Sequence, residues 1–149
     1  MRLSARGDRG AVVRRRGEIA IAARQTATGG KRDEAKATRD FALAAARLAA
    51  NTRCRDVAVL DLHGVWPVAE FFVVATGTSP RQMRSVCDEI EELAAQTGGK
   101  AYSRSGYEGE TWIVVDFVDV VIHLFSQEAR LYYDLDNLWG DAPKVAWEE

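Results

Sequence analysis

The sequence predicts an α/β fold in which helices flank a mixed β-sheet of about five strands. Segments of nearly continuous apolar residues are typical of strands that are covered on both faces. They are interspersed with stretches whose apolar residues recur every three or four positions, which is the period of a helix. The expected order is helix, strand, strand, helix, short strand, strand, strand, helix, and this order indicates an α/β sandwich around a mixed sheet.

A first helix is expected over residues 33–53, with acidic residues near its start and Arg53 near its end, as the helix dipole favours. Helical spacing places on its apolar face Phe41, Ala45, Leu48 and Ala49. Strands follow over residues 56–62 and 70–76. The second of these has little alternation, so we expect it to be buried on both faces.

The stretch VVATGTSPRQMRSV, residues 73–86, leads from this strand into a second helix. Ser79 is a good N-cap and Pro80 suits the first helical position, so the turn is explained without a ligand. A phosphate-binding loop would need GxxxxGK[ST] and a dinucleotide site GxGxxG, and neither pattern is present. The helix is expected to end at Gly98-Gly99, with an apolar stripe of Met83, Val86, Ile90 and Leu93.

The remaining third of the chain predicts one more sheet segment and a last helix. A short edge strand over 100–104 is followed by two strands over 111–117 and 119–125, joined by a tight turn around Phe117-Val118. The last helix is expected over 127–140, with Leu131, Leu135 and Leu138 at helical spacing.

Charge divides the 149-residue chain into two parts. The net charge of −2 combines +6 on residues 1–40 with −8 on residues 41–149. Residues 1–32 are rich in Arg and Gly and have no sustained period, so we interpret them as a basic, disordered extension of a domain over 33–149. The acidic domain should prefer a basic partner to bare nucleic acid.

The chain is expected to be a cytoplasmic protein that does not enter a membrane. Cys54 and Cys87 belong to no CxxC pattern, which argues against a disulfide framework and a zinc ribbon and favours a reducing compartment. Asp116 and Asp119 interrupt the longest apolar stretch, which is then too short to span a bilayer.

The sequence predicts no catalytic residues, no metal ion and no cofactor. In nucleotidyltransferases, two acidic residues that alternate on a strand hold Mg²⁺, because only alternate positions point to the same face. Asp116 and Asp119 are three apart across a turn, and Asp134 and Asp136 would diverge on a helix. The two histidines, His63 and His123, are too scattered for a metal cluster, and no GxSxG motif is present.

Aromatic and acidic side chains are concentrated in the last third of the chain, and the core cannot accept them all. We interpret the surplus as a protein-binding face. Its candidate residues are Trp112, Asp116, Asp119, Glu128 and Tyr132. A local alternative stays open, in which Asp116 and Asp119 only stabilise their own turn by hydrogen bonds.

Two segments carry a family resemblance: LDLHGVWPVAEFFVVATGTSPRQMRSVCDEI, residues 60–90, and EGETWIVVDFVDVVIHLFSQEARLYYDLDNLWGDAP, residues 108–143. With the motifs ATGTS, WxxxDxxDVVxH and RxYYxLxxLW, residues 41–143 resemble the ribosomal silencing factor (RsfS, or Iojap) family. In that family the turn between the last two strands often carries glycine, whereas Val118 stands here; a β-branched residue tolerates positive φ poorly.

The resemblance implies a nucleotidyltransferase-like fold without the catalytic acids. It also implies a translation repressor that binds the large ribosomal subunit through ribosomal protein fourteen and sterically blocks joining of the small subunit. Two alternatives stay open: a Mg²⁺-dependent nucleotidyltransferase with a rearranged acidic site, and an RNA-binding assembly factor whose basic extension makes a weak contact with ribosomal RNA. The oligomeric state is also open, a homodimer included.

Overall fold

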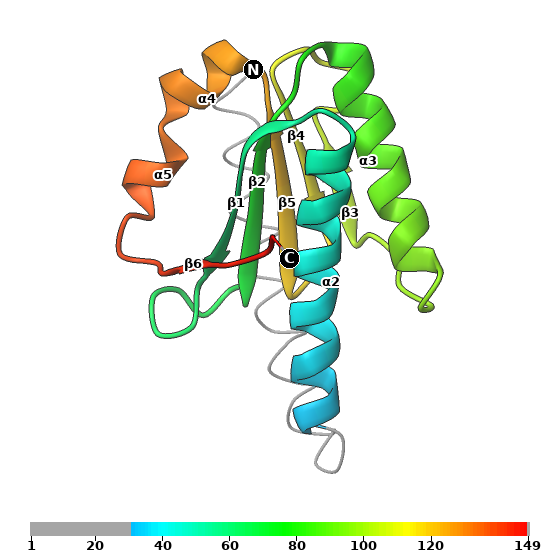
Figure 1. Cartoon of the computed structure of the whole chain (residues 1–149), viewed down its shortest axis with the longest axis vertical. Coiled ribbons are helices and arrows are strands. Elements are labelled where there is room, and N and C mark those ends of the chain that lie inside the picture. Colours follow the sequence, from blue (N-terminus) through cyan, green and yellow to red (C-terminus); the bar gives the residue numbers. More distant parts are fainter. Residues whose placement is uncertain (1–30, 149) are drawn as a thin grey trace.

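Helices cover both faces of a six-stranded sheet in the computed structural model, which describes residues 31–148 (Figure 1). The elements in chain order are α2 (Lys31–Asn51), β1 (Arg55–Asp61), β2 (Phe71–Thr76), α3 (Pro80–Ala95), β3 (Ser103–Ser105), β4 (Trp112–Asp116), β5 (Val120–Phe125), α4 (Gln127–Tyr133), α5 (Leu135–Leu138) and β6 (Lys144–Val145). The predicted α/β class is thereby confirmed, with one strand more than expected. The predicted basic extension lies outside the described residues, except for its last two, which begin α2.

The sheet has the strand order β3-β4-β5-β2-β1-β6. Its two central strands, β2 and β5, are parallel, with Thr76 opposite Phe125, and all other neighbouring strands are antiparallel. The carboxyl ends of β2 and β5 therefore meet at one edge of the sheet. Both α3 and α4 begin at this edge, each capped by a serine, Ser79 and Ser126.

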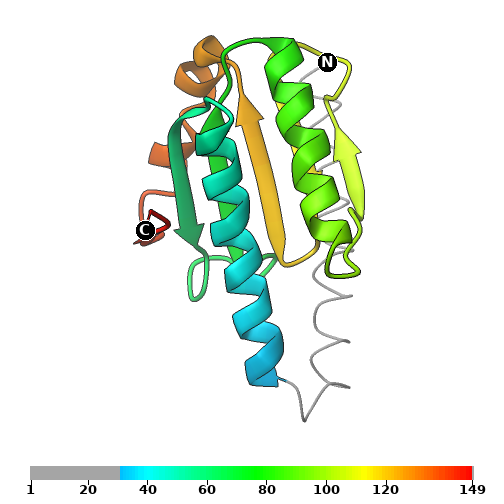
Figure 2. The same ribbon diagram turned by 45° about the vertical axis from the view of Figure 1, so that its right-hand side comes forward.

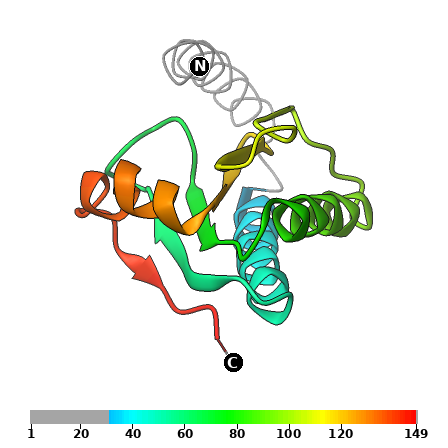
Figure 3. The ribbon, with the colours of Figure 1, turned by 90° about the horizontal axis from the view of Figure 1, so that it is seen from above.

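Helices α2 and α3 lie side by side on one face of the sheet (Figure 2), and α4 and α5 lie on the other (Figure 3). All six residues of β5 are buried, as burial on both faces requires. Ile122 and Leu124 point toward α2 and α3, whereas Val121 and Phe125 belong to the core under α4 and α5. The near absence of alternation in the sequence is explained by these two cores.

Small side chains bring α2 close to the sheet. The fully buried residues of α2 are alanines, Ala42, Ala45, Ala46 and Ala49. The predicted face included Phe41 and Leu48, which are half-buried at its margin. The first turns of α2 extend beyond the strands (Figures 1 and 2), and their residues are exposed.

The start of α3 is formed as the sequence predicts. Ser79 accepts the backbone N–H of Gln82 (3.1 Å), and Pro80 occupies the first helical position. The buried stripe runs through Met83, Val86 and Ile90, but it ends on Ala94 rather than on Leu93, which is half-buried.

The last helix is not continuous, so this part of the prediction is wrong. Asp134 has a φ of 48°, in the left-handed region, and its N–H bonds to the carbonyl of Arg130 (3.1 Å), which closes α4. The break resets the helical phase between α4 and α5. Leu135 is buried, whereas Leu131 and Leu138, expected on the same face, are 75 % and 69 % exposed.

A strand that the sequence pattern does not show closes the outer edge of β1. In β6, Lys144 and Val145 pair with Leu60 and Val59. Trp147 follows and donates from its indole nitrogen to the carbonyl of Val57 (3.1 Å). Two residues are too few for a period to be recognised, so the prediction omitted this strand.

Candidate functional site

The β4–β5 turn contains two of the five predicted binding residues, Asp116 and Asp119. Asp116 is only 2 % exposed, and its Oδ1 accepts the backbone N–H of Val118 (2.7 Å). That bond supports Val118 at a φ of 78°, the conformation that a β-branched residue tolerates poorly. A buried side chain presents no surface to a partner, so we correct the expectation for Asp116 and assign it to the turn.

Asp119 is half-exposed, and its backbone connects the turn to the start of β2. Its carbonyl accepts the N–H groups of Glu70 (2.8 Å) and Phe71 (3.1 Å). The turn lies at one end of the six-residue strand β5, and α4 follows the other end. At about 3.3 Å per residue, these ends are roughly 20 Å apart.

The other three predicted residues lie together at the far end of β5. Trp112 pairs with Phe125 across β4 and β5, and their rings stack with centroids 4.8 Å apart. Trp112 also contacts Tyr133 (4.7 Å), which meets Tyr132 edge to face (5.0 Å). Glu128 precedes Tyr132 by one helical turn, so the two lie on the same side of α4.

An exposed surface results, formed by Glu128, Leu131, Tyr132 and Leu138, and we call it the α4–α5 surface. Among the described residues, three of the four exposed large hydrophobic side chains belong to it, and Tyr132 is 70 % exposed. Large apolar side chains that a folded domain leaves exposed on neighbouring elements favour a binding surface there. Sequence reasoning missed Leu131 and Leu138, because helical spacing alone places them in the core.

Residues beneath this surface hold it in place. Leu135 is buried, and the indole of Trp139 stacks on that of Trp66 (4.5 Å, 17° between planes). Arg130, itself buried, donates to the hydroxyl of Thr76 at the end of β2 (2.9 Å). The outward side chains of α4 and α5 are thus presented on a support that is anchored to the sheet.

The turn after β2 borders a cavity of about 410 Å³ at the edge where β2 and β5 end. Its charged lining consists of Arg55, Glu110 and Glu128, so two carboxylates, which repel a phosphate, stand against one cation. The backbone N–H of Gly77 bonds to the carbonyl of Phe125 (2.7 Å), and that of Thr78 to Oε1 of Gln82 (3.0 Å). These two donors, which a phosphate-binding loop would use, are therefore taken, in agreement with the helix-start interpretation.

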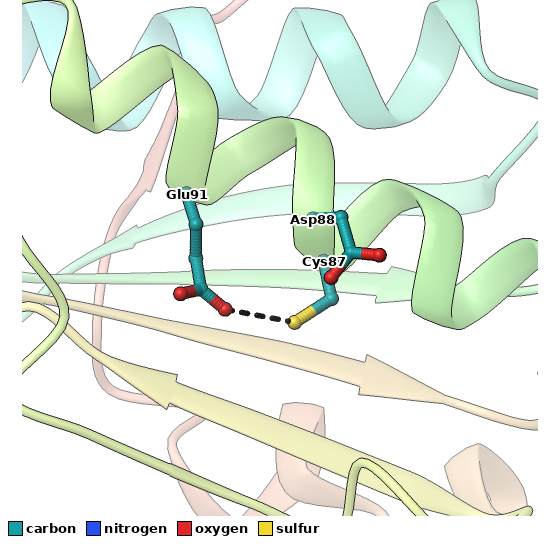
Figure 4. Close-up of side chains that lie close together, drawn as sticks. All are labelled: Cys87, Asp88 and Glu91. Atoms are coloured by element: carbon teal, nitrogen blue, oxygen red, sulfur yellow. Dashed lines mark hydrogen bonds between the residues drawn. The ribbon is translucent and has the colours of Figure 1, made fainter.

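A group of three side chains on α3 has atoms close enough to share a metal ion: Cys87, Asp88 and Glu91 (Figure 4). Burial, and then the carboxylate of Glu91, raise the pKa of Cys87 to about 12, so its thiol is protonated and donates to Glu91 (3.4 Å). Arg104 donates to Glu91 (2.9 Å) and the hydroxyl of Tyr107 to Asp88 (2.9 Å), so the donor set fits a structural network better than a metal site.

The two histidines lie in different surroundings, His63 in an exposed turn and His123 in the core. His63 places Nδ1 against Asp61 (2.5 Å) and Nε2 against Glu70 (3.2 Å). Burial opposes ionisation of Asp61, but hydrogen bonds from His63 outweigh it and hold the pKa of Asp61 below its usual value. His123 is buried, and its Nδ1 accepts the indole N–H of Trp112 (3.2 Å).

Fold and site together define a class: an α/β sandwich with an exposed, partly acidic aromatic surface on its last helices. The chain belongs to the RsfS family, because the family model described as "Ribosomal silencing factor during starvation" matches residues 35–149. Among the described residues, no helix has the length and apolar character needed to cross a membrane.

Individual relatives agree with this assignment. The chain is similar to the ribosomal silencing factor RsfS of Bacillus subtilis, with 37% identity over 61% of this chain and 77% of the relative. It is also similar to RsfS of Halalkalibacterium halodurans, with 35% identity over 64% of this chain and 82% of the relative. A crystal structure of a protein from Chromobacterium violaceum matches with a TM-score of 0.64 and 27% identity, over 74% of this chain and 89% of that chain.

Proposed function

We propose that this protein is a cytoplasmic translation repressor that binds the large ribosomal subunit through ribosomal protein fourteen. Occupying that position sterically prevents the small subunit from joining. The family supports a role on the ribosome. Blocking an association requires affinity and placement but no chemistry, so the fold needs a binding surface rather than a catalytic centre.

The observation that carries the proposal is the α4–α5 surface. Its apolar groups, Leu131, Tyr132 and Leu138, can be desolvated by a partner, and Glu128 supplies a charge beside them. Ribosomal proteins are generally basic, and residues 41–149 carry −8. Complementary charge steers encounter and fixes register, while buried aromatic anchors supply most of the affinity.

Asp119 can belong to the same interface although it lies at the other end of β5. A standard protein interface covers about 800 Å² on each partner, which is roughly 30 Å across. The separation of roughly 20 Å fits within that extent. We therefore retain Trp112, Asp119, Glu128 and Tyr132 as proposed contacts, with Asp119 at the rim.

Site-specific photocrosslinking tests the proposal. Tyr132 is replaced by p-benzoylphenylalanine, and the full chain is irradiated with purified large subunits; the same replacement at Glu92, exposed on α3 across the sheet, is the matched control. The proposal predicts a crosslink from position 132 to ribosomal protein fourteen and none from position 92. A crosslink from position 132 to ribosomal RNA alone would instead support the assembly-factor alternative.

A further inference from the structure

The side chain of Trp112, one of the proposed contacts, is held by a hydrogen bond to a residue of the core. Its Nε1 donates to Nδ1 of His123 on the neighbouring strand (3.2 Å), and the two rings lie 5.9 Å apart. An indole has only this donor, and an imidazole nitrogen accepts only when it carries no proton. The bond therefore requires His123 to be neutral, with its proton on Nε2.

His123 is itself fixed by its surroundings. It is 2 % exposed, and its ring meets Phe72 edge to face (4.6 Å) and lies parallel to Phe125 (6.1 Å). A hydrogen bond inside such an aromatic, water-poor cluster is stronger than the same bond in water, so it restrains the orientation of both rings. Trp112, by contrast, is only half-buried and forms the margin of the cluster.

We propose that His123 is a positioning residue for ribosome binding: its neutral Nδ1 holds the indole of Trp112 in the orientation in which a partner meets it. This inference rests on the proposed function. Protonation of Nδ1 would replace the acceptor by a second donor facing the indole N–H.

The charged and titratable groups that face this part of the core come from two elements, β4 and α4. On β4, Asp116 lies opposite Val121, one side-chain position before His123 on this face. On α4, Arg130 donates to Thr76, which pairs with Phe125, the next residue after His123 on this face of β5. Tyr133, also on α4, contacts Trp112. Because these groups are present in every variant of His123, comparing variants at one pH isolates the contribution of the imidazole.

The test uses His123→Asn and His123→Leu, because the Asn and Leu side chains have nearly the same shape as each other. Asn places a carbonyl oxygen close to the position of Nδ1 and keeps an acceptor, whereas Leu removes it. Binding of the full-length variants to purified large subunits is measured at about pH 8, where the unperturbed imidazole is neutral. At this pH we expect Asn to bind within about threefold of wild type and Leu about tenfold more weakly.

Two further readouts separate positioning from general stability. His123→Leu combined with Trp112→Phe should be no weaker than the weaker single variant, since both changes remove one interaction. The indole N–H signal of Trp112, assigned by its absence from Trp112→Phe, should shift in His123→Leu, which removes the acceptor, and much less in His123→Asn, which keeps one.

Two results would overturn the inference: a folded His123→Leu that binds like wild type, or losses that add in the double variant. If wild type itself fails to bind large subunits, the proposed function is wrong. The indole signal then still decides whether His123 restrains Trp112.

Discussion

Val118 occupies a conformation that costs stability at the β4–β5 turn. A left-handed φ costs an ordinary residue about 1–2 kcal/mol, and Asn tolerates it far better than a β-branched residue. Val118→Asn should therefore raise the free energy of unfolding by about 1 kcal/mol in urea denaturation. Val65→Asn is the matched control, because Val65 is also partly exposed in a loop but is not among the residues with positive φ. If both variants changed the free energy of unfolding by the same amount relative to wild type, Val118 would not be strained.

Cys87 should make stability fall in alkali. Its pKa is raised to about 12 by burial and by Glu91, against about 8.5 in an unfolded chain. A raised pKa means that the folded state holds the proton more tightly, so this contribution is complete below about pH 8.5 and is lost as the pH rises toward about 12.

Urea unfolding of wild type and Cys87→Ala at two pH values measures this effect. Between about pH 8 and pH 10.5, wild type should lose about 2 kcal/mol more than Cys87→Ala. The other alkaline groups, Cys54 included, are common to both proteins and cancel. Parallel curves for the two proteins would show that the thiol ionises as readily in the fold as outside it.

At the level of the element, α4 and α5 give opposite predictions for two leucines that helical spacing treats alike. Leu135→Ala should lower the free energy of unfolding by roughly 2–5 kcal/mol, because Leu135 is buried in the core between the sheet and helices α4 and α5. Leu138→Ala should change it by under about 0.5 kcal/mol, since the side chain is exposed. Thermal or urea unfolding distinguishes the two variants. Equal losses of stability would contradict the break at Asp134 and support one continuous helix.

The same elements show how far sequence reasoning reached. The start of α3 was predictable because Ser79 and Pro80 act locally, and β2 and β5 were predictable because burial on both faces makes a long apolar run. The break at Asp134 depends on one residue accepting a left-handed φ, and β6 depends on tertiary pairing with β1. For the same reason the sequence indicated the exposure of the proposed contacts only in part: Glu128 and Tyr132 are exposed, as a binding surface requires, but Asp116 is buried.

For the whole molecule, we expect the domain alone to carry ribosome binding. Deleting residues 1–30, which leaves α2 intact, should change the affinity for large subunits by under about 1 kcal/mol, the scale of a few screened surface charges. Titration at moderate salt measures the change. A loss of tenfold or more, steeply dependent on salt, would show that the basic segment contacts ribosomal RNA.

The most direct test of the central claim is subunit joining followed by light scattering. Purified large subunits are incubated with one of three proteins before small subunits are added. The proteins are wild type, the double variant Glu128→Lys/Tyr132→Ala, and Glu92→Lys, a charge reversal on α3 across the sheet. Wild type and Glu92→Lys should inhibit joining at the same concentration, and the double variant, folded by circular dichroism, should need at least about tenfold more. Inhibition by the folded double variant at the wild-type concentration would contradict the assignment of the α4–α5 surface.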